Sequence, residues 1–172
     1  DFTVEYYYDN VIDITATVTG NGQLGNAIPH TPKPRDGYVL LTIVNENGVI
    51  TDIPANNVVK YYYVKDYFDY TVEYYYDNLL DGTKTDTGNA LFQSVINSYT
   101  DKNINGYKFD KTENFPLTIS FNESLNIIKV YYIKDTFNYK IQYHYEDILF
   151  DDTKTETGSA LFGSVISTYP DK

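Results

Sequence analysis

The sequence predicts a mainly β protein, α+β at most, built from small modules in tandem. Its strongest indication is a repeated string, VEYYYDN at Val4–Asn10, which returns unchanged at Val72–Asn78 and in diverged form, IQYHYED, at Ile141–Asp147. The copies lie about 70 residues apart, which is the size of one small domain. Their residues are mostly β-branched or aromatic, a composition typical of strands.

Two further strings align the copies and set the module boundaries. They are TGNGQLGNAI, TGNALFQSVI and TGSALFGSVI, which begin at Thr19, Thr87 and Thr157, and KYYYVKD and KVYYIKD, which begin at Lys60 and Lys129. We therefore expect one module at residues 1–66, a second at 67–135, and the N-terminal half of a third at 136–172. The third copy ends before its closing strand, so we expect an open sheet edge there that allows self-association of this fragment.

The opening strand of each module is predicted to bury alternate residues. Val4, Tyr6 and Tyr8 share one face, and the copies keep this face aromatic or aliphatic. The other face, with Glu5 and Tyr7, accepts polar replacements in the third copy, so we expect it to face solvent. In the closing strand the same reasoning places Val59, Tyr61 and Tyr63 inside with Ile128, Val130 and Tyr132.

Between the opening and closing strands we expect a hairpin turn and further strands. The segments DNVID and DNLLDG carry turn residues, ITATVTG alternates apolar residues with threonines, and GYKF and LNIIKVYYIK are typical of strands. The segment ALFQSVI is compatible with a short helix or a strand, because seven residues are too few to separate the two.

The junctions between modules are short and contain no Pro-, Gly- or Ser-rich spacer. Each carries a phenylalanine, Phe68 or Phe137, where a flexible linker would be polar. We expect these rings to pack between neighbouring modules and to hold them end to end as a stiff rod.

Composition excludes several classes of partner and site. A net charge of −11 and a pI near 4.4 argue against nucleic acid and anionic membranes as partners, because both require basic residues. No cysteine is present, so disulfides and thiolate metal sites are excluded. No stretch is apolar enough to span a membrane, so we expect no membrane contact in this fragment and place any signal or anchor outside it.

The sequence predicts no enzyme. The two histidines, His30 and His144, fall at unmatched positions of different copies, so we expect them to be surface residues rather than a catalytic pair. No cofactor is expected. The acidic turn residues suit turns for conformational reasons, and the alternative that they bind calcium stays open for Asp9, Asp13, Asp77, Asp81, Asp151 and Asp152.

The outward tyrosines are the candidate binding residues. If the opening and closing strands are neighbours, each complete module presents a pair of rings flanked by Glu and Lys, a surface on which sugars and proteins stack. The predicted ligand-binding residues are Tyr7, Tyr62, Tyr75 and Tyr131.

The order of these strings resembles the mucin-binding-protein (MucBP) repeats found in tandem on surface proteins of Gram-positive bacteria. The matching pieces are VEYYYD, a TG turn, GY with an apolar residue, and IIKVYYIKD. The resemblance implies β-grasp-like modules in an extracellular, cell-wall-anchored parent protein. One departure is that GNGQLGNAI holds three glycines, of which the second copy replaces two and the third copy replaces one.

Together these observations predict a non-enzymatic stalk that projects a distal adhesive domain from the cell wall. The alternative is that the modules themselves bind host mucin glycans or a host surface protein through the tyrosine pairs.

Overall fold

The computed structural model describes residues 1–143 and 155–169. These residues are mainly β, and their only helical turns are the 3-10 turns η1 (Pro54–Asn56) and η2 (Glu123–Leu125). No helix in this part of the chain has the length and apolar character needed to cross a membrane. The chain divides into two compact units, Asp1–Tyr70 with Gly88–Ile96 and Thr118–Asn126, and Thr71–Thr87 with Asn97–Leu117 and Ile127–Lys172.

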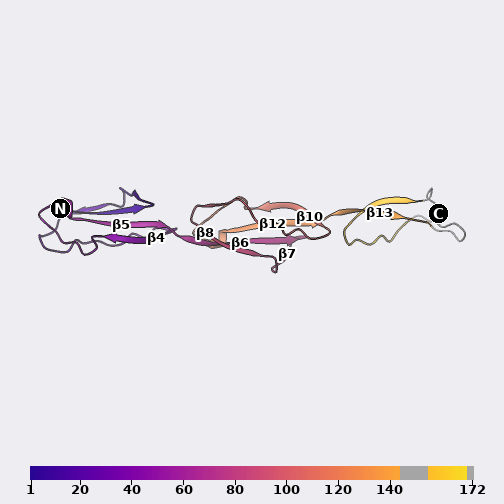
Figure 1. Cartoon of the computed structure of the whole chain (residues 1–172), viewed down its shortest axis with the longest axis horizontal. Coiled ribbons are helices and arrows are strands. Elements are labelled where there is room, and N and C mark those ends of the chain that lie inside the picture. The colour runs from indigo at the N-terminus through magenta and orange to yellow at the C-terminus, as the bar shows by residue number, and fades with distance from the viewer. Residues whose placement is uncertain (144–154, 170–172) are drawn as a thin grey trace. The chain divides into compact units, whose positions relative to one another are not determined.

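The first copy of the repeat forms a five-stranded sheet. Its strands are β1 (Phe2–Tyr8), β2 (Val11–Ile12), β3 (Val18–Gly20), β4 (Tyr38–Val44) and β5 (Val58–Lys65). The order is β2-β1-β5-β4, and β3 pairs with β1. Figure 1 labels the neighbouring strands β4 and β5. β1 and β5 run parallel, so the opening and closing strands are neighbours.

The second copy repeats this topology. Its strands are β6 (Tyr67–Tyr76), β7 (Leu79–Leu80), β8 (Asp86–Leu91), β10 (Tyr107–Glu113) and β12 (Ile127–Lys134). The order is β10-β12-β6-β7, β8 pairs with β6, and β6 and β12 run parallel. The same connections in the same order show that the chain is a tandem β repeat.

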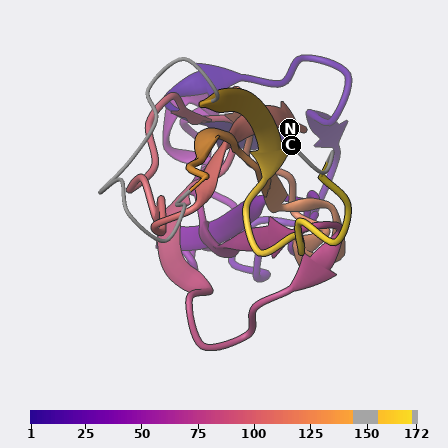
Figure 2. The same cartoon turned by 90° about the vertical axis from the view of Figure 1, so that its right-hand side faces the viewer.

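Two small sheets complete the described residues. β9 (Val95–Ile96) pairs with β11 (Leu117–Thr118), and β13 (Thr136–Ile141) pairs antiparallel with β14 (Glu156–Leu161). The β13–β14 pair is drawn in orange and yellow in Figure 2. Among the described strands β14 is the only partner of β13, and self-association through its other edge stays a prediction.

The predicted alternation of inner and outer residues is confirmed. In β1 the side chains of Val4, Tyr6 and Tyr8 are 1%, 1% and 7% exposed, while Glu5 and Tyr7 between them are half-buried. The remaining inward residues are also buried: Val59, Tyr61, Tyr63, Val72, Tyr74, Tyr76, Ile128, Val130 and Tyr132.

Hydroxyl groups of the buried tyrosines fix the long crossover between β3 and β4. Tyr6 Oη donates to the carbonyl of Thr31 at 2.7 Å, and Tyr8 Oη donates to the carbonyl of Lys33 at 2.7 Å. The N–H of Lys33 in turn donates to Tyr63 Oη at 2.9 Å. A buried hydroxyl needs a partner, so each tyrosine binds the backbone of an extended segment that no sheet supports.

The second copy holds its crossover in the same way. Tyr74 Oη donates to the carbonyl of Thr100 at 2.6 Å, and Tyr76 Oη donates to that of Lys102. The N–H of Lys102 donates to Tyr132 Oη at 3.1 Å. This repeated use of inner tyrosines gives a reason why tyrosines stand beside the aliphatic residues of the core.

The strand predicted at ITATVTG is mostly wrong. Only Val18–Gly20 is strand, and Ile14 is 78% exposed. The carboxylate of Asp13 accepts the N–H groups of Thr15 at 3.0 Å and Ala16 at 3.1 Å, and this local bonding closes a turn instead.

The segment ALFQSVI is neither a helix nor a single strand. β8 ends at Leu91 and β9 begins at Val95, with Gln93 at φ 63° between them. A residue in the left-handed region cannot continue either regular element.

A fully buried asparagine closes each copy, a feature that the sequence analysis missed. Asn57 Oδ1 accepts the N–H and the hydroxyl of Thr51, both at 2.8 Å, and its Nδ2 donates to the carbonyls of Asp1 and Thr51. Asn126 binds the backbone of Ser120 and Asp69 in the same manner. The side-chain amide of each asparagine therefore links the turn before the closing strand to the first residues of the opening strand by hydrogen bonds.

Candidate functional site

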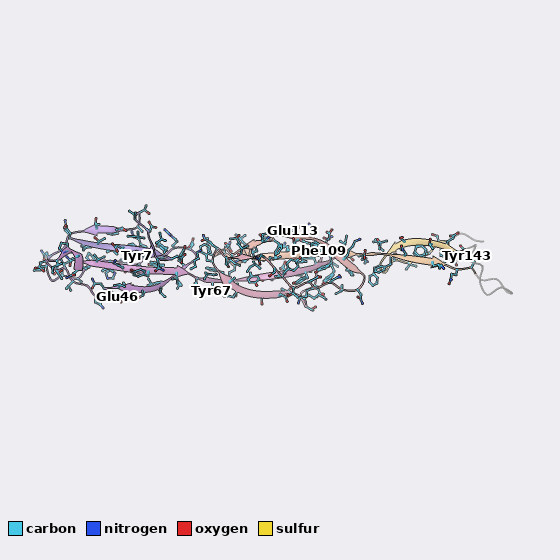
Figure 3. The ribbon with its side chains drawn as sticks, turned by 45° about the horizontal axis from the view of Figure 1, so that its top comes forward. Tyr7, Glu46, Tyr67, Phe109, Glu113 and Tyr143 are labelled. Carbon is cyan, nitrogen blue, oxygen red and sulfur yellow. The ribbon has the colours of Figure 1, made fainter. Side chains whose placement is uncertain are left out.

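The structure brings the outward tyrosines together in pairs. Tyr7 lies opposite Tyr62 in the parallel β1–β5 register, with ring centroids 4.7 Å apart and planes at 15° (Figure 3 labels Tyr7). Tyr75 and Tyr131 are opposite each other in β6 and β12, with centroids 4.9 Å apart and planes at 20°. Parallel in-register pairing places equivalent rings face to face, so each complete copy carries one stacked pair on its outer face.

Carboxylates bind the hydroxyl groups of these tyrosines. Tyr7 Oη donates to Glu5 Oε2 at 2.7 Å, and Lys60 forms an ion pair with the same carboxylate at 3.2 Å. Tyr75 Oη donates to Glu73 Oε2 at 2.7 Å, and this bond, which favours the neutral phenol, raises the pKa of Tyr75 to about 12. The Glu5 and Glu73 bonds therefore favour the neutral form of Tyr7 and Tyr75.

Lysine side chains lie over the same rings. The Nζ atom of Lys111 is 4.7 Å from the Tyr131 centroid, where it also pairs with Glu113, the acceptor for Tyr131 Oη. Lys60 Nζ lies 5.6 Å from the Tyr7 centroid. The rings of Tyr7 and Tyr131 each stack on a partner ring and each have a lysine over them. An incoming ligand therefore meets ring edges and a network of Glu and Lys.

The first acidic residue of each hairpin turn lies beside a tyrosine and a lysine. Asp9 and Asp77 have positive φ values of 49° and 52°, which the tight turn requires. Asp9 accepts the Tyr38 hydroxyl at 3.3 Å and lies 3.9 Å from Lys65 Nζ. Asp77 accepts the Tyr107 hydroxyl at 3.0 Å and lies 3.6 Å from Lys134 Nζ.

The second acidic residue of each turn binds a cation of the protein itself. Asp13 pairs with Arg35, whose guanidinium lies 3.8 Å from the Tyr8 centroid. Asp81 pairs with Lys84, whose Nζ lies 5.3 Å from the Tyr76 centroid. The Thr15 hydroxyl lowers the pKa of Asp13, and Lys84 lowers that of Asp81.

Calcium binding by these turns stays a prediction. Within residues 1–143 and 155–169, no three acidic, histidine or cysteine side chains gather to hold a metal ion. Asp151 and Asp152 lie outside the described residues.

His30 is not the exposed residue that the sequence analysis expected. Its Nδ1 lies 2.6 Å from the Tyr61 hydroxyl and its Nε2 lies 2.8 Å from the carbonyl oxygen of Glu46, and the ring is half-buried. It therefore joins the core tyrosines to the turn after β4. His144 lies outside the described residues.

Within the first unit, the ring of Phe92 fits a socket formed by the end of the first copy. An ideal Cβ on Gly37 would lie 2.3 Å from Phe92 Cδ1, so only glycine leaves room for the ring. Tyr38 and Phe68 meet Phe92 edge to face, with centroids 6.0 and 6.1 Å away. The N–H of Phe92 donates to the carbonyl of Asp66 at 2.8 Å, and the N–H of Asp66 donates to that of Gly37 at 2.9 Å.

The second unit contains the same socket between the second and third copies. Phe162 lies against Gly106, whose ideal Cβ would be 2.3 Å from Phe162 Cδ1, and against Tyr107 and Phe137 at 6.3 and 6.1 Å. The N–H of Phe162 donates to the carbonyl of Asp135 at 2.9 Å. We call each arrangement a junction socket: Gly37, Tyr38 and Phe68 around Phe92, and Gly106, Tyr107 and Phe137 around Phe162.

Sequence analysis found Phe68 and Phe137 but missed the rings that they contact. The available signal was the match of Phe92 with Phe162 in the aligned copies, paired with the match of Gly37 with Gly106. The first copy carries Leu24 at this position, and its side chain is 72% exposed.

Comparison with known proteins assigns no family to the chain. No family model and no curated protein matches it. Among solved structures, the chain is similar to one described as "Crystal structure of Mub-RV", with 12% sequence identity, a TM-score of 0.29, and coverage of 77% of this chain and 97% of that one. This likeness is too low to transfer a function.

Proposed function

We propose that this chain is a non-enzymatic repeat region of a bacterial cell-surface protein, similar to MucBP repeats, and that it acts as a stiff stalk holding a distal adhesive domain away from the cell wall. The order of the aligned strings and the common topology of the two sheets support a repeat region of this kind.

The junction socket is the observation that most strongly supports a stiff stalk. The Tyr38–Phe92 ring contact, a glycine that admits the Phe92 ring and the hydrogen bond from Phe92 N–H to the Asp66 carbonyl join one copy to the next, where a flexible linker would have none of these. The same contacts recur at the second junction, so each added copy would be fixed by the same local interactions.

The test is a distance measurement across the first junction. Because the chain has no cysteine, the variant Asn47→Cys with Asp110→Cys takes two spin labels at exposed sites of the first and second copies. We expect a single narrow distance distribution by electron paramagnetic resonance, which Phe92→Ser broadens.

The matched control is Phe109→Ser, which removes a 52% exposed ring outside the junction and should leave the distribution narrow. A broad distance distribution in the spin-labelled protein that keeps Phe92 would rule out the stiff stalk.

The second candidate function is that the copies themselves bind mucin glycans or a host surface protein. It is favoured by the recurrence of the stacked tyrosine pair, with flanking Glu and Lys, on both complete sheets.

A glycan and mucin array separates the two functions. Saturable binding that is lost when Tyr7, Tyr62, Tyr75 and Tyr131 are all replaced by serine, but kept in Tyr67→Ser, would make the tyrosine pairs the adhesive surface. Tyr67 is a suitable control because it is 61% exposed and belongs to neither stacked pair. If the folded protein binds nothing on the array, the result favours the stalk over the adhesive surface.

A further inference from the structure

Strand β4 is an open and uncharged edge of the first sheet. It pairs with β5 on one side only, and β5 is its sole partner among the described strands. Its sequence, YVLLTIV, contains no charged residue. Four apolar side chains on it are exposed, at 43% for Val39, 39% for Leu40, 63% for Leu41 and 47% for Val44.

The equivalent strand of the second sheet is protected against pairing. β10 has the same position at the sheet edge and the same irregularity in register, at Leu40/Thr42 in β4 and at Phe109/Lys111 in β10. Its sequence, YKFDKTE, replaces the exposed apolar residues of β4 with alternating Lys, Asp and Glu around Phe109 (Figure 3). Charged residues are the usual means by which proteins block edge-to-edge pairing.

We infer that β4 is a self-association surface on which two copies of this chain pair strand to strand, antiparallel and related by a two-fold axis. The outward N–H and C=O groups of one β4 complement those of another under this symmetry, since antiparallel strands exchange both kinds of bond. The contact uses one surface on both partners, so it closes at a dimer and does not propagate.

Charge limits where a second molecule of this chain can bind, and β4 is a place where it does not oppose binding. Two chains of net charge −11 repel each other over most of their surface, whereas the seven residues of β4 bring no like charges together. In the dimer, Val39, Leu41 and Val44 would be buried against the same residues of the second molecule. The burial of this apolar surface would stabilise the dimer in addition to the new hydrogen bonds.

The test transfers the charge pattern of β10 onto β4 in the full chain. The graft is Val39→Lys, Leu41→Asp, Thr42→Lys and Val44→Glu, which the shared register makes compatible with the fold. In sedimentation equilibrium we expect the parent chain to dimerise as its concentration rises, and the graft to weaken that dimer by about tenfold or more. The control, Phe109→Lys on β10, should dimerise as the parent does.

Hydrogen exchange on the parent protein keeps the inference testable if the graft does not fold. The β4 amides that point away from β5 should exchange more slowly at high than at low protein concentration, while β10 amides show no such dependence. A parent chain that stays monomeric at high concentration would overturn the inference, and so would a dimer that the graft leaves intact.

Discussion

Tyrosine serves two purposes in this chain, and its position in the strand decides which. Inward tyrosines such as Tyr6 and Tyr8 are buried and donate to backbone carbonyls of the crossover, so they fix chain path as well as filling the core. Outward tyrosines such as Tyr7 and Tyr75 donate to carboxylates two residues away on their own strand. The sequence shows the alternation, but not which acceptor each hydroxyl finds.

The Tyr75–Glu73 bond predicts a pH dependence. The pKa of Tyr75 is about 12 in the folded protein, above the ordinary value of 10.0 for tyrosine, so the neutral phenol is favoured by folding. The corresponding stability is fully present below pH 10 and is lost as the pH rises through about 12. We expect Glu73→Gln to lower this pKa towards 10, measured from the Cζ chemical shift of labelled tyrosine in an NMR titration.

Glu46→Gln is the control for this titration, because Glu46 is an exposed acid on the first copy and is not among the groups that raise the Tyr75 pKa (Figure 3 labels Glu46). An unchanged Tyr75 pKa in Glu73→Gln would contradict the assigned cause.

At the scale of elements, the long strands and the first hairpin turn of each complete copy were predictable, whereas the turn at Asp13 was not. Comparison of the copies identified the inward residues of β1, β5, β6 and β12, because burial constrains alternate positions. The turn after Asp13 was missed because its carboxylate binds two nearby N–H groups, which overrides the alternating pattern of the next residues. Asn57 was missed because nothing in its immediate sequence separates a buried asparagine from a turn residue.

The buried asparagine predicts a measurable loss of stability. Asn57→Ala leaves the N–H and C=O of Thr51 without their amide partner inside the protein. We expect the free energy of unfolding to fall by about 1–3 kcal/mol for each unpaired group, measured by urea denaturation.

Asn126→Ala should have a similar effect, because it removes the corresponding bonds to Ser120. Asn47→Ala, at an exposed position, should change stability by less than about 0.5 kcal/mol. Equal effects of the Asn57 and Asn47 variants would show that the buried bonds stabilise nothing.

At the scale of the whole molecule, the number and order of copies followed from the repeated strings, but the junction did not. Two of its rings, Phe68 and Phe92, lie far apart in the module sequence and meet only after folding. The repeat of Gly37 and Phe92 as Gly106 and Phe162 is visible in the sequence, yet their contact depends on a turn geometry that the sequence does not reveal.

Two glycines with the same backbone conformation test the first junction socket. Gly37 and Gly25 have φ values of +83° and +85°, so alanine at either position costs about 1–2 kcal/mol of backbone strain. Only Gly37→Ala also places a Cβ against the Phe92 ring, because nothing lies within 4 Å of an ideal Cβ on Gly25.

We expect Gly37→Ala to destabilise the protein more than Gly25→Ala and to remove hydrogen-exchange protection from the Phe92 N–H, which donates to Asp66. If the Phe92 N–H stays protected from hydrogen exchange in Gly37→Ala, the position of the Phe92 ring does not depend on the socket.

The parallel pairing of the first and last strands has a mechanical consequence. The chain enters the first sheet at Phe2 and leaves it at Lys65, at opposite ends of the β1–β5 pair. Tension between these two points slides one strand along the other, so the hydrogen bonds of the pair are loaded together and must fail together. β6 and β12 have the same geometry in the second copy. A repeat built in this way resists shear along its strands, whereas a hairpin pulled at its open end would unzip one bond at a time.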